Sequence, residues 1–298
     1  MTMQGHDLNN IELKPAADFG GSEKKRVGVF EGKKYLFKLP DPIREKNNDL
    51  SYMNNQFSEY IGSHIFNLLG IKAQDTILGE KNIDGINKIL VGCEVFTTNK
   101  KGVGEFSDFL NSVDFDAKNG YKNQSIETFE LIVSEKGFDT SKFIEQFNDM
   151  IVVDCLLVNQ DRHFHNIGFE TINDVFVPTK IYDCGSCLCA LKSDEALEKL
   201  LKDDSLFKSD VYNISPPYFY KGQRLKYHEL FNEPSNNLKQ AINKIYPKID
   251  INSINKLIDD TPYISDIRKT FYKKAILFNY ENIIKKSYFK INYIENKS

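Results

Sequence analysis

Asp161 and Asn166 are the residues whose types and spacing most strongly suggest catalytic chemistry. They begin and end the run DRHFHN, so four residues separate them. A carboxylate and an amide at this spacing can accept a proton from a substrate hydroxyl and hold a divalent cation, as in the catalytic loop of phosphoryl-transfer enzymes. Because the pattern also arises by chance, its meaning depends on the groups around it.

Asp183 supplies a second acidic group further along the chain, and Gly185 follows it. Two short apolar runs at 167–169 and 175–177 predict a hairpin that leads into this Asp-x-Gly segment. Transfer of a γ-phosphoryl group requires cations that neutralise the developing charge. Asn166 and Asp183 offer the hard oxygen ligands that suit Mg²⁺.

The first third of the chain offers groups that could bind the phosphates of ATP. Gly20, Gly21 and Ser22 precede a predicted strand, where backbone N–H groups can approach phosphates closely. Lys38 lies in the next strand, and Glu59 lies on the following helix, where its carboxylate is placed to pair with the lysine. A glycine loop, strand lysine, helix acid, Asp-x4-Asn and Asp-x-Gly in this order predict an ATP-Mg²⁺ site.

These groups must be positioned by a sheet and one helix at the N-terminal side. Turn residues at Glu31-Gly32 and Asp84-Gly85 predict two hairpins, and a five-stranded sheet with one helix fits the chain through about Val95. In the segment 35–38 the alternation directs Tyr35 and Phe37 to one face and Lys38 to the other. The apolar stripe from 57 to 69 predicts the helix.

The chain after Thr97 is predicted to be mostly helical, so the fold class is α+β. Ser125 is typical of a helix N-cap. A second apolar pattern between 143 and 158 predicts a helix that leads directly into the polar segment at Asn159, and later stripes between 254 and 271 predict packed helices. The catalytic segment therefore follows a buried helix and precedes a short hairpin.

The composition is that of an ordinary globular protein. Hydrophobic residues make up 41% of the 298 residues and charged residues 27%, which excludes disorder over most of the chain. A net charge of −3 predicts no nucleic-acid partner and no membrane partner. The longest apolar stretch, 150–158, is interrupted by Asp154 and is too short to span a bilayer. Without a secretory signal, the five cysteines are expected to be reduced, in a cytoplasmic protein.

Together these motifs resemble those of the HipA-type serine/threonine kinases. The resemblance extends from about Phe19 to about Phe278 and is greatest to a short subgroup of that family. It is carried by the runs NQDRHFHNIGF at 159–169 and IYDCGSCL at 181–188, with further similarity at 19–21, 35–40, 57–60, 93–98 and 245–250.

The resemblance implies a bilobal protein-kinase-like fold with a small β-rich N-lobe at 1–97, a hinge at 93–97 and a larger helical C-lobe at 98–298. It also implies a role for each matching residue. Asp161 matches the catalytic aspartate, and Asn166 and Asp183 match magnesium ligands. Lys38 matches the lysine that binds the α- and β-phosphates, and Glu59 matches the acid that orients this lysine. Glu94 and Phe96 match hinge positions that hold adenine, and His163 and Tyr182 match positions that line the metal site.

The function implied by the resemblance is ATP-dependent phosphorylation of a protein serine or threonine, with autophosphorylation, for which Ser22 is a candidate site. A toxin or effector role follows by analogy. The protein substrate would then be a bacterial translation factor or a host protein. An antitoxin partner, and translocation into a host cell, both stay open.

Two other classes of function stay open. A pseudokinase would bind the nucleotide without transferring phosphate. A metal-dependent hydrolase would use Asp161, His163 and His165, whose spacing resembles that of metal ligands. Cys184, Cys187 and Cys189 also have metal-like spacing, but we expect ordinary thiols, because no second cysteine pair accompanies them.

Overall fold

A six-stranded sheet forms the N-terminal part of the computed structural model, which describes residues 5–16, 24–40, 54–96, 103–112, 124–135 and 137–295. The strand order is β1-β5-β6-β4-β3-β2, and every neighbouring pair is antiparallel except β1 with β5. The strands are β1 (His6–Asp7), β2 (Lys14–Pro15), β3 (Lys25–Phe30), β4 (Lys33–Lys38), β5 (Thr76–Ile83) and β6 (Ile86–Glu94). The expected number of five strands is wrong by one. The sheet includes β1 and β2, which have two residues each and are too short to show an alternating pattern.

Both predicted hairpins are present and close through two-residue turns. In the first turn the φ angles of Glu31 and Gly32 are 46° and 77°, and in the second those of Asp84 and Gly85 are 54° and 82°. Positive φ at both positions is the turn geometry that matches the twist of antiparallel strands, and glycine at the second position adopts it without strain. The first turn sets the pairing of β3 with β4, and the second sets that of β5 with β6; β4 and β6 then lie side by side in the middle of the sheet.

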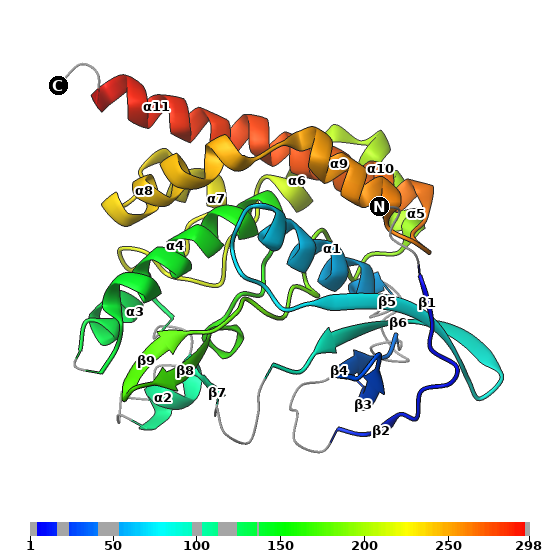
Figure 1. The fold of residues 1–298 in the computed structure, drawn as a ribbon. Coiled ribbons are helices and arrows are strands. Elements are labelled where there is room, and N and C mark those ends of the chain that lie inside the picture. Colours follow the sequence, from blue (N-terminus) through cyan, green and yellow to red (C-terminus); the bar gives the residue numbers. More distant parts are fainter. Residues whose placement is uncertain are drawn as a thin grey trace.

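Helix α1 (Asn55–Leu68) lies between the sheet and the helical part of the molecule (Figure 1). Its buried residues Phe57, Ile61 and Ile65 belong to one large core that also contains sheet residues such as Leu78 and Val91 and most of the buried residues of the later helices. The sheet and the helices therefore share one apolar interior through α1. The predicted domain boundary at residue 97 lies outside the described residues and stays a prediction.

The rest of the described chain is mainly helical, as predicted. Ser125 caps α3 by accepting a hydrogen bond from the backbone N–H of Thr128. The α-helices are α2 (Phe106–Ser112), α3 (Ile126–Val133), α4 (Thr140–Leu156), α5 (Asp194–Lys202), α6 (Asp204–Val211), α7 (Tyr227–Asn232), α8 (Asn236–Ile245), α9 (Ile251–Asp260), α10 (Asp266–Asn279) and α11 (Lys285–Glu295). No described helix is both long and apolar enough to cross a bilayer.

A small second sheet lies beside α4, on the same side of the molecule as α2 and α3 (Figure 1). Its strands, in the order β7-β8-β9, are β7 (Val103–Glu105), β8 (Gly168–Ile172) and β9 (Val175–Pro178). The β8–β9 hairpin is the one predicted from the apolar runs. The short 3₁₀ helix η3 (Phe164–Asn166) precedes it.

Phe164 anchors the middle of the DRHFHN run in an aromatic cluster. Its side chain is fully buried, and its ring centroid lies 5.3 Å from that of Phe106 and 5.8 Å from that of Phe129. Phe129 in turn stacks on Phe147 of α4, with the ring centroids 4.1 Å apart. This packing holds the backbone between Asp161 and Asn166 in place.

Replacing Phe164 by alanine should lower the free energy of unfolding by about 3–5 kcal/mol, because it removes a buried aromatic ring and leaves a cavity. Urea unfolding followed by circular dichroism measures this change. Leu131→Ala is the control, since Leu131 is exposed, and it should change the free energy by less than about 0.5 kcal/mol. A similar small effect for both variants would contradict the anchoring role.

Candidate active site

Lys38 lies between two carboxylates that come from different parts of the chain. Its Nζ is 2.5 Å from Oε2 of Glu59 on α1 and 2.7 Å from Oδ1 of Asp183, which follows β9. The lysine is 6% exposed and Glu59 is 1% exposed. Tyr35 and Phe37 pack into a small cluster on the opposite face of the sheet, as the alternation predicts, so Lys38 faces the site.

Glu59 connects the lysine to the backbone of the Asp-x-Gly segment. While Oε2 accepts a hydrogen bond from Lys38, Oε1 accepts one from the backbone N–H of Cys184, with an N–O distance of 2.9 Å. The absence of a side chain at Gly185 permits this approach, because a Cβ there would lie 3.1 Å from Oε2 of Glu59. The close approach of Glu59 thus explains why the Asp-x-Gly motif has glycine at position 185.

The charges around Asp183 keep it ionised. Desolvation alone would raise the pKa of Asp183, but the ammonium group of Lys38 and, more weakly, the guanidinium of Arg162 lower it to about 2. Its side chain nevertheless remains 43% exposed. Asp183 therefore offers an anionic group at the surface of the site.

Arg162 and Asp154 form a buried ion pair that sequence reasoning did not assign to the site. Arg162 is 0% exposed, and its Nε donates to Oδ2 of Asp154 at 3.0 Å while its Nη2 lies 3.3 Å from Oδ1. Its Nη1 donates to the backbone carbonyls of Tyr182 and Asp183. The signal in the sequence is the position of Asp154, the one charged residue of the apolar stretch 150–158.

Asp161 and Asn166 belong to one closed loop. The Asn166 side-chain amide donates to the backbone carbonyl of Asp161 at 2.8 Å, and the Asp161 N–H donates to Oδ1 of Asn159 at 3.1 Å. The Asp161 carboxylate is 57% exposed; Oδ2 accepts a hydrogen bond from Ser186 and Oδ1 lies 3.7 Å from Nε2 of His163. The loop thus presents an accessible carboxylate beside a fixed amide.

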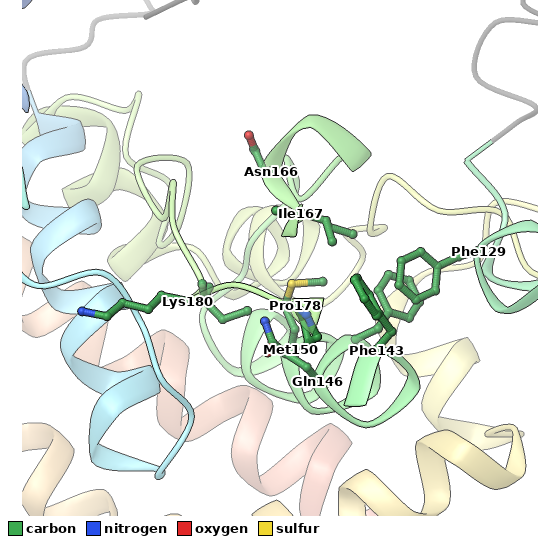
Figure 2. A pocket seen from close by; sticks show the side chains of 11 residues that line it. Phe129, Phe143, Gln146, Met150, Asn166, Ile167, Pro178 and Lys180 are labelled. Carbon is green, nitrogen blue, oxygen red and sulfur yellow. The ribbon is translucent and has the colours of Figure 1, made fainter. Parts of the chain in front are cut away.

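A small cavity lies behind this loop, between the aromatic cluster and α4. It has room for at most one water molecule, about 10 Å³, and apolar side chains such as Phe143 and Met150 line it. Figure 2 shows the Asn166 side chain directed away from these residues. The cavity is therefore too small to hold a nucleotide or a substrate side chain.

His165 and Tyr182 link the loop to the second sheet. The Tyr182 hydroxyl donates to the backbone carbonyl of His165 at 2.8 Å, while Nδ1 of His165 lies 2.6 Å from Oγ of Ser107 and 2.9 Å from Oε2 of Glu105. Within the described ranges, no group of three His, Cys, Asp or Glu side chains is arranged to hold a metal ion. This arrangement does not assemble the ligand cluster that the hydrolase hypothesis requires.

The predicted hinge residues lie where β6 ends. The Glu94 N–H donates to the Asp75 carbonyl at 2.8 Å, and the Glu94 carbonyl accepts from the Gln74 side chain at 3.0 Å. The ring of Phe96 lies 6.3 Å from that of Tyr182. An adenine bound to the Glu94 carbonyl would share this acceptor with Gln74. The predicted phosphate-loop residues Gly20, Gly21 and Ser22 lie outside the described residues.

The cysteines after Asp183 contribute to packing. Cys184 and Cys187 are buried and Cys189 is partly buried, and all five cysteines of the chain are free thiols. Sγ of Cys184 lies 3.4 Å from Nη2 of Arg162, so this thiol completes the surroundings of the guanidinium.

The pKa of Asp183 should be about 2 in the folded protein and should rise towards its usual value near 3.8 in a Lys38→Met variant, because the nearest cation is lost. NMR of the carboxyl carbon measures this titration. Since the folded pKa is depressed, the ion pair stabilises the fold above pH 3.8, and this contribution is lost as the pH falls towards 2. In the control Lys33→Met, whose lysine pairs with Glu94, Asp183 should titrate as in the wild type. A wild-type pKa near 3.8 would contradict the assignment.

Comparison with known proteins shows similarity over almost the entire chain, although no protein-family model matches it. The serine/threonine-protein kinase CtkA of Helicobacter pylori strain J99 is 33% identical over 273 residues, which cover 89% of this chain and 82% of that protein.

Solved structures show the same fold. The crystal structure of the Helicobacter pylori proinflammatory kinase CtkA matches with a TM-score of 0.86 and 28% identity, over 98% of this chain and 99% of that one. HipA, from the Shewanella oneidensis MR-1 toxin–antitoxin complex with HipB and operator DNA, matches in fold with a TM-score of 0.59 at 15% identity, over 97% of this chain and 70% of that one. The α+β kinase-like fold is thereby confirmed, and the chain belongs to the HipA-type serine/threonine-protein kinases, the family of CtkA.

Proposed function

We propose that this chain is an ATP-dependent, Mg²⁺-requiring kinase that phosphorylates serine or threonine residues of a protein. The observation that carries the proposal is the placement of Lys38 between Glu59 and Asp183. A buried lysine with one fully buried carboxylate and one accessible carboxylate is suited to bind phosphates while remaining oriented. The kinase CtkA, which is similar along nearly the whole chain, supports this interpretation.

Asp183 and Asn166 are the residues that would hold Mg²⁺. The donor set fits this ion, because both side chains offer hard oxygens and the low pKa of Asp183 keeps its carboxylate anionic at any physiological pH. When bound, Mg²⁺ neutralises charge on the phosphate oxygens. Lys38 would contact the α- and β-phosphates, and the Glu59 carboxylate would keep its ammonium group in place.

Asp161 is proposed as the residue that accepts the proton of the substrate hydroxyl. Its carboxylate is accessible, and Ser186 and His163 on either side restrict its orientation. Most of the rate acceleration in such a reaction comes from positioning and charge stabilisation, so the rigid loop between Asp161 and Asn166 matters as much as the basicity of the carboxylate.

The proposal extends to autophosphorylation, with Ser22 as the candidate residue. A phosphate at this position would compete with those of ATP for the backbone donors of the predicted glycine loop. By analogy with the toxin–antitoxin context of the Shewanella HipA and the proinflammatory Helicobacter kinase, we propose a toxin or effector role. The protein substrate would be a translation factor or a host protein. An antitoxin would be the partner in a toxin role. The protein would act in the bacterial cytoplasm or, after translocation, in that of a host cell.

Asp161→Ala should reduce phosphoryl transfer on the order of 100- to 10,000-fold and leave ATP binding nearly unchanged, because the residue acts on the hydroxyl. Asp183→Ala should reduce transfer and also weaken binding of Mg²⁺-ATP. Transfer of labelled γ-phosphate to the protein itself and to proteins of a cell extract measures the reaction, and calorimetry measures nucleotide binding.

The matched control is Asp259→Ala, which removes an exposed carboxylate that pairs with Lys273 on the helical side and should retain full activity. ATP binding without any transfer by the unphosphorylated wild-type protein would refute the kinase proposal in favour of a pseudokinase. Mass spectrometry establishes the phosphorylation state beforehand.

A further inference from the structure

A cavity of about 250 Å³ lies in the helical part and includes none of the residues assigned to the active site. Its walls come from α7, from α11, from Tyr212 at the end of α6 and from η5 (Tyr280–Ile284), a π-helical turn that joins α10 to α11. Figure 1 shows α7 and α11 on the side of the molecule away from the six-stranded sheet. Its volume is somewhat below that of common small-molecule sites.

Two cations of this cavity have no acidic partner in the described part of the chain. Lys286 and Lys290, one helical turn apart on α11, both line the cavity. Nζ of Lys286 contacts Oδ1 of Asn282 at 3.1 Å, and Nζ of Lys290 contacts the backbone and side-chain oxygens of Asn232 at 2.8 and 2.9 Å. The neighbouring Lys285 instead pairs with Glu281 at 2.7 Å and does not line the cavity.

His228 on α7 adds a polar atom that lacks a partner. Its ring stacks on Tyr212, with centroids 4.3 Å apart and an angle of 6° between the planes, and both residues line the cavity. Nε2 of His228 is buried and makes no hydrogen bond to the described residues. A buried nitrogen without a hydrogen-bond partner lowers the stability of the fold, unless a ligand or a water molecule supplies the missing hydrogen bond.

The charges around His228 favour an anion as that ligand. Burial lowers the pKa of His228; among its neighbours, Glu229 raises the pKa and Lys226 lowers it. Of the charged residues, Glu229, Lys286 and Lys290 line the cavity, and Lys226 does not. At the start of α7, Oε2 of Glu229 accepts a hydrogen bond from the backbone N–H of Lys226. One oxygen of the Glu229 carboxylate is therefore already engaged. The cavity thus holds more positive charge than negative charge.

The π-helical turn contributes to the same wall. Asn282 and Ile283 of η5 line the cavity. Such turns cost helical stability and occur often at functional sites, because they displace side chains from regular helical positions. Here the turn lies directly before the segment that carries both lysines.

We propose that this cavity binds a phosphate monoester, with Lys286 and Lys290 contacting the phosphate oxygens and His228 donating a hydrogen bond from Nε2. Lysines act as point charges towards phosphate. The apolar wall formed by Tyr212, Phe231 and Ile283 fits the organic part of the ester, and the cavity is larger than a free phosphate ion requires.

The test is a titration of the full chain with phenyl phosphate, followed by NMR of the histidine rings and by calorimetry, with inorganic phosphate as a second arm. Phenyl phosphate should shift the His228 resonance and raise the pKa of His228, because a nearby anion stabilises the imidazolium. Lys286→Gln/Lys290→Gln should weaken binding at least about tenfold. His228→Phe, which keeps the stacking on Tyr212, should also weaken it.

Lys285→Gln is the matched control, since it removes the same charge from the adjacent position, and it should bind as the wild type does. Equal weakening by this control, or binding that the cavity variants leave unchanged, would overturn the proposal. So would the absence of binding at millimolar concentration. Tighter binding of inorganic phosphate than of the ester would overturn the assignment to an organic phosphate. Because no arm measures phosphoryl transfer, failure here is separate from failure of the proposed kinase function.

Discussion

The structure of the site depends on the burial of one guanidinium group, that of Arg162. A buried charge is tolerated only when its partners are in place, and breaking such a pair typically costs about 3–5 kcal/mol. The partners of Arg162 come from separate segments: the Asp154 carboxylate on α4 and the carbonyls of residues 182 and 183. Because the guanidinium needs all of these partners, it fixes α4, the loop from Asp161 to Asn166 and the Asp-x-Gly segment relative to each other.

A second ion pair extends this fixed arrangement to the sheet. Because the backbone at Asp183 is held by Arg162, its carboxylate can meet Lys38 of β4, and Glu59 of α1 meets the same lysine from the other side. Lys38 is held between them because β4 pairs with β3 on one side and with β6 on the other. Lys38 carries one positive charge against the two negative charges of Glu59 and Asp183, so these three groups together carry a net charge of −1 where a nucleotide is proposed to bind.

Local patterns in the sequence were sufficient to predict the hairpins and the helices α1, α3, α4, α9 and α10. Turn glycines and alternating apolar residues act over a few positions, so Gly32, Gly85 and the direction of Lys38 could be inferred. The two-residue strands β1 and β2 have no such pattern. The role of Asp154 was missed because its significance depends on a loop that folds back onto α4. Likewise, the bond from Cys184 to Glu59 joins residues 125 positions apart and requires the complete fold.

Helix α1 has a consequence for how such an enzyme can be controlled. It is attached on both sides: Ser58 bonds to Tyr272 of α10, and Gly62 lies so close to Cys184 that a side chain at position 62 would collide with it. Moving Glu59 away from Lys38 would require parting a continuous hydrophobic interior, which costs far more than breaking an exposed ion pair. These contacts hold α1 in place between the sheet and the later helices. For the proposed kinase, these contacts favour control through the supply of nucleotide, the approach of the substrate or covalent modification over control by displacement of α1.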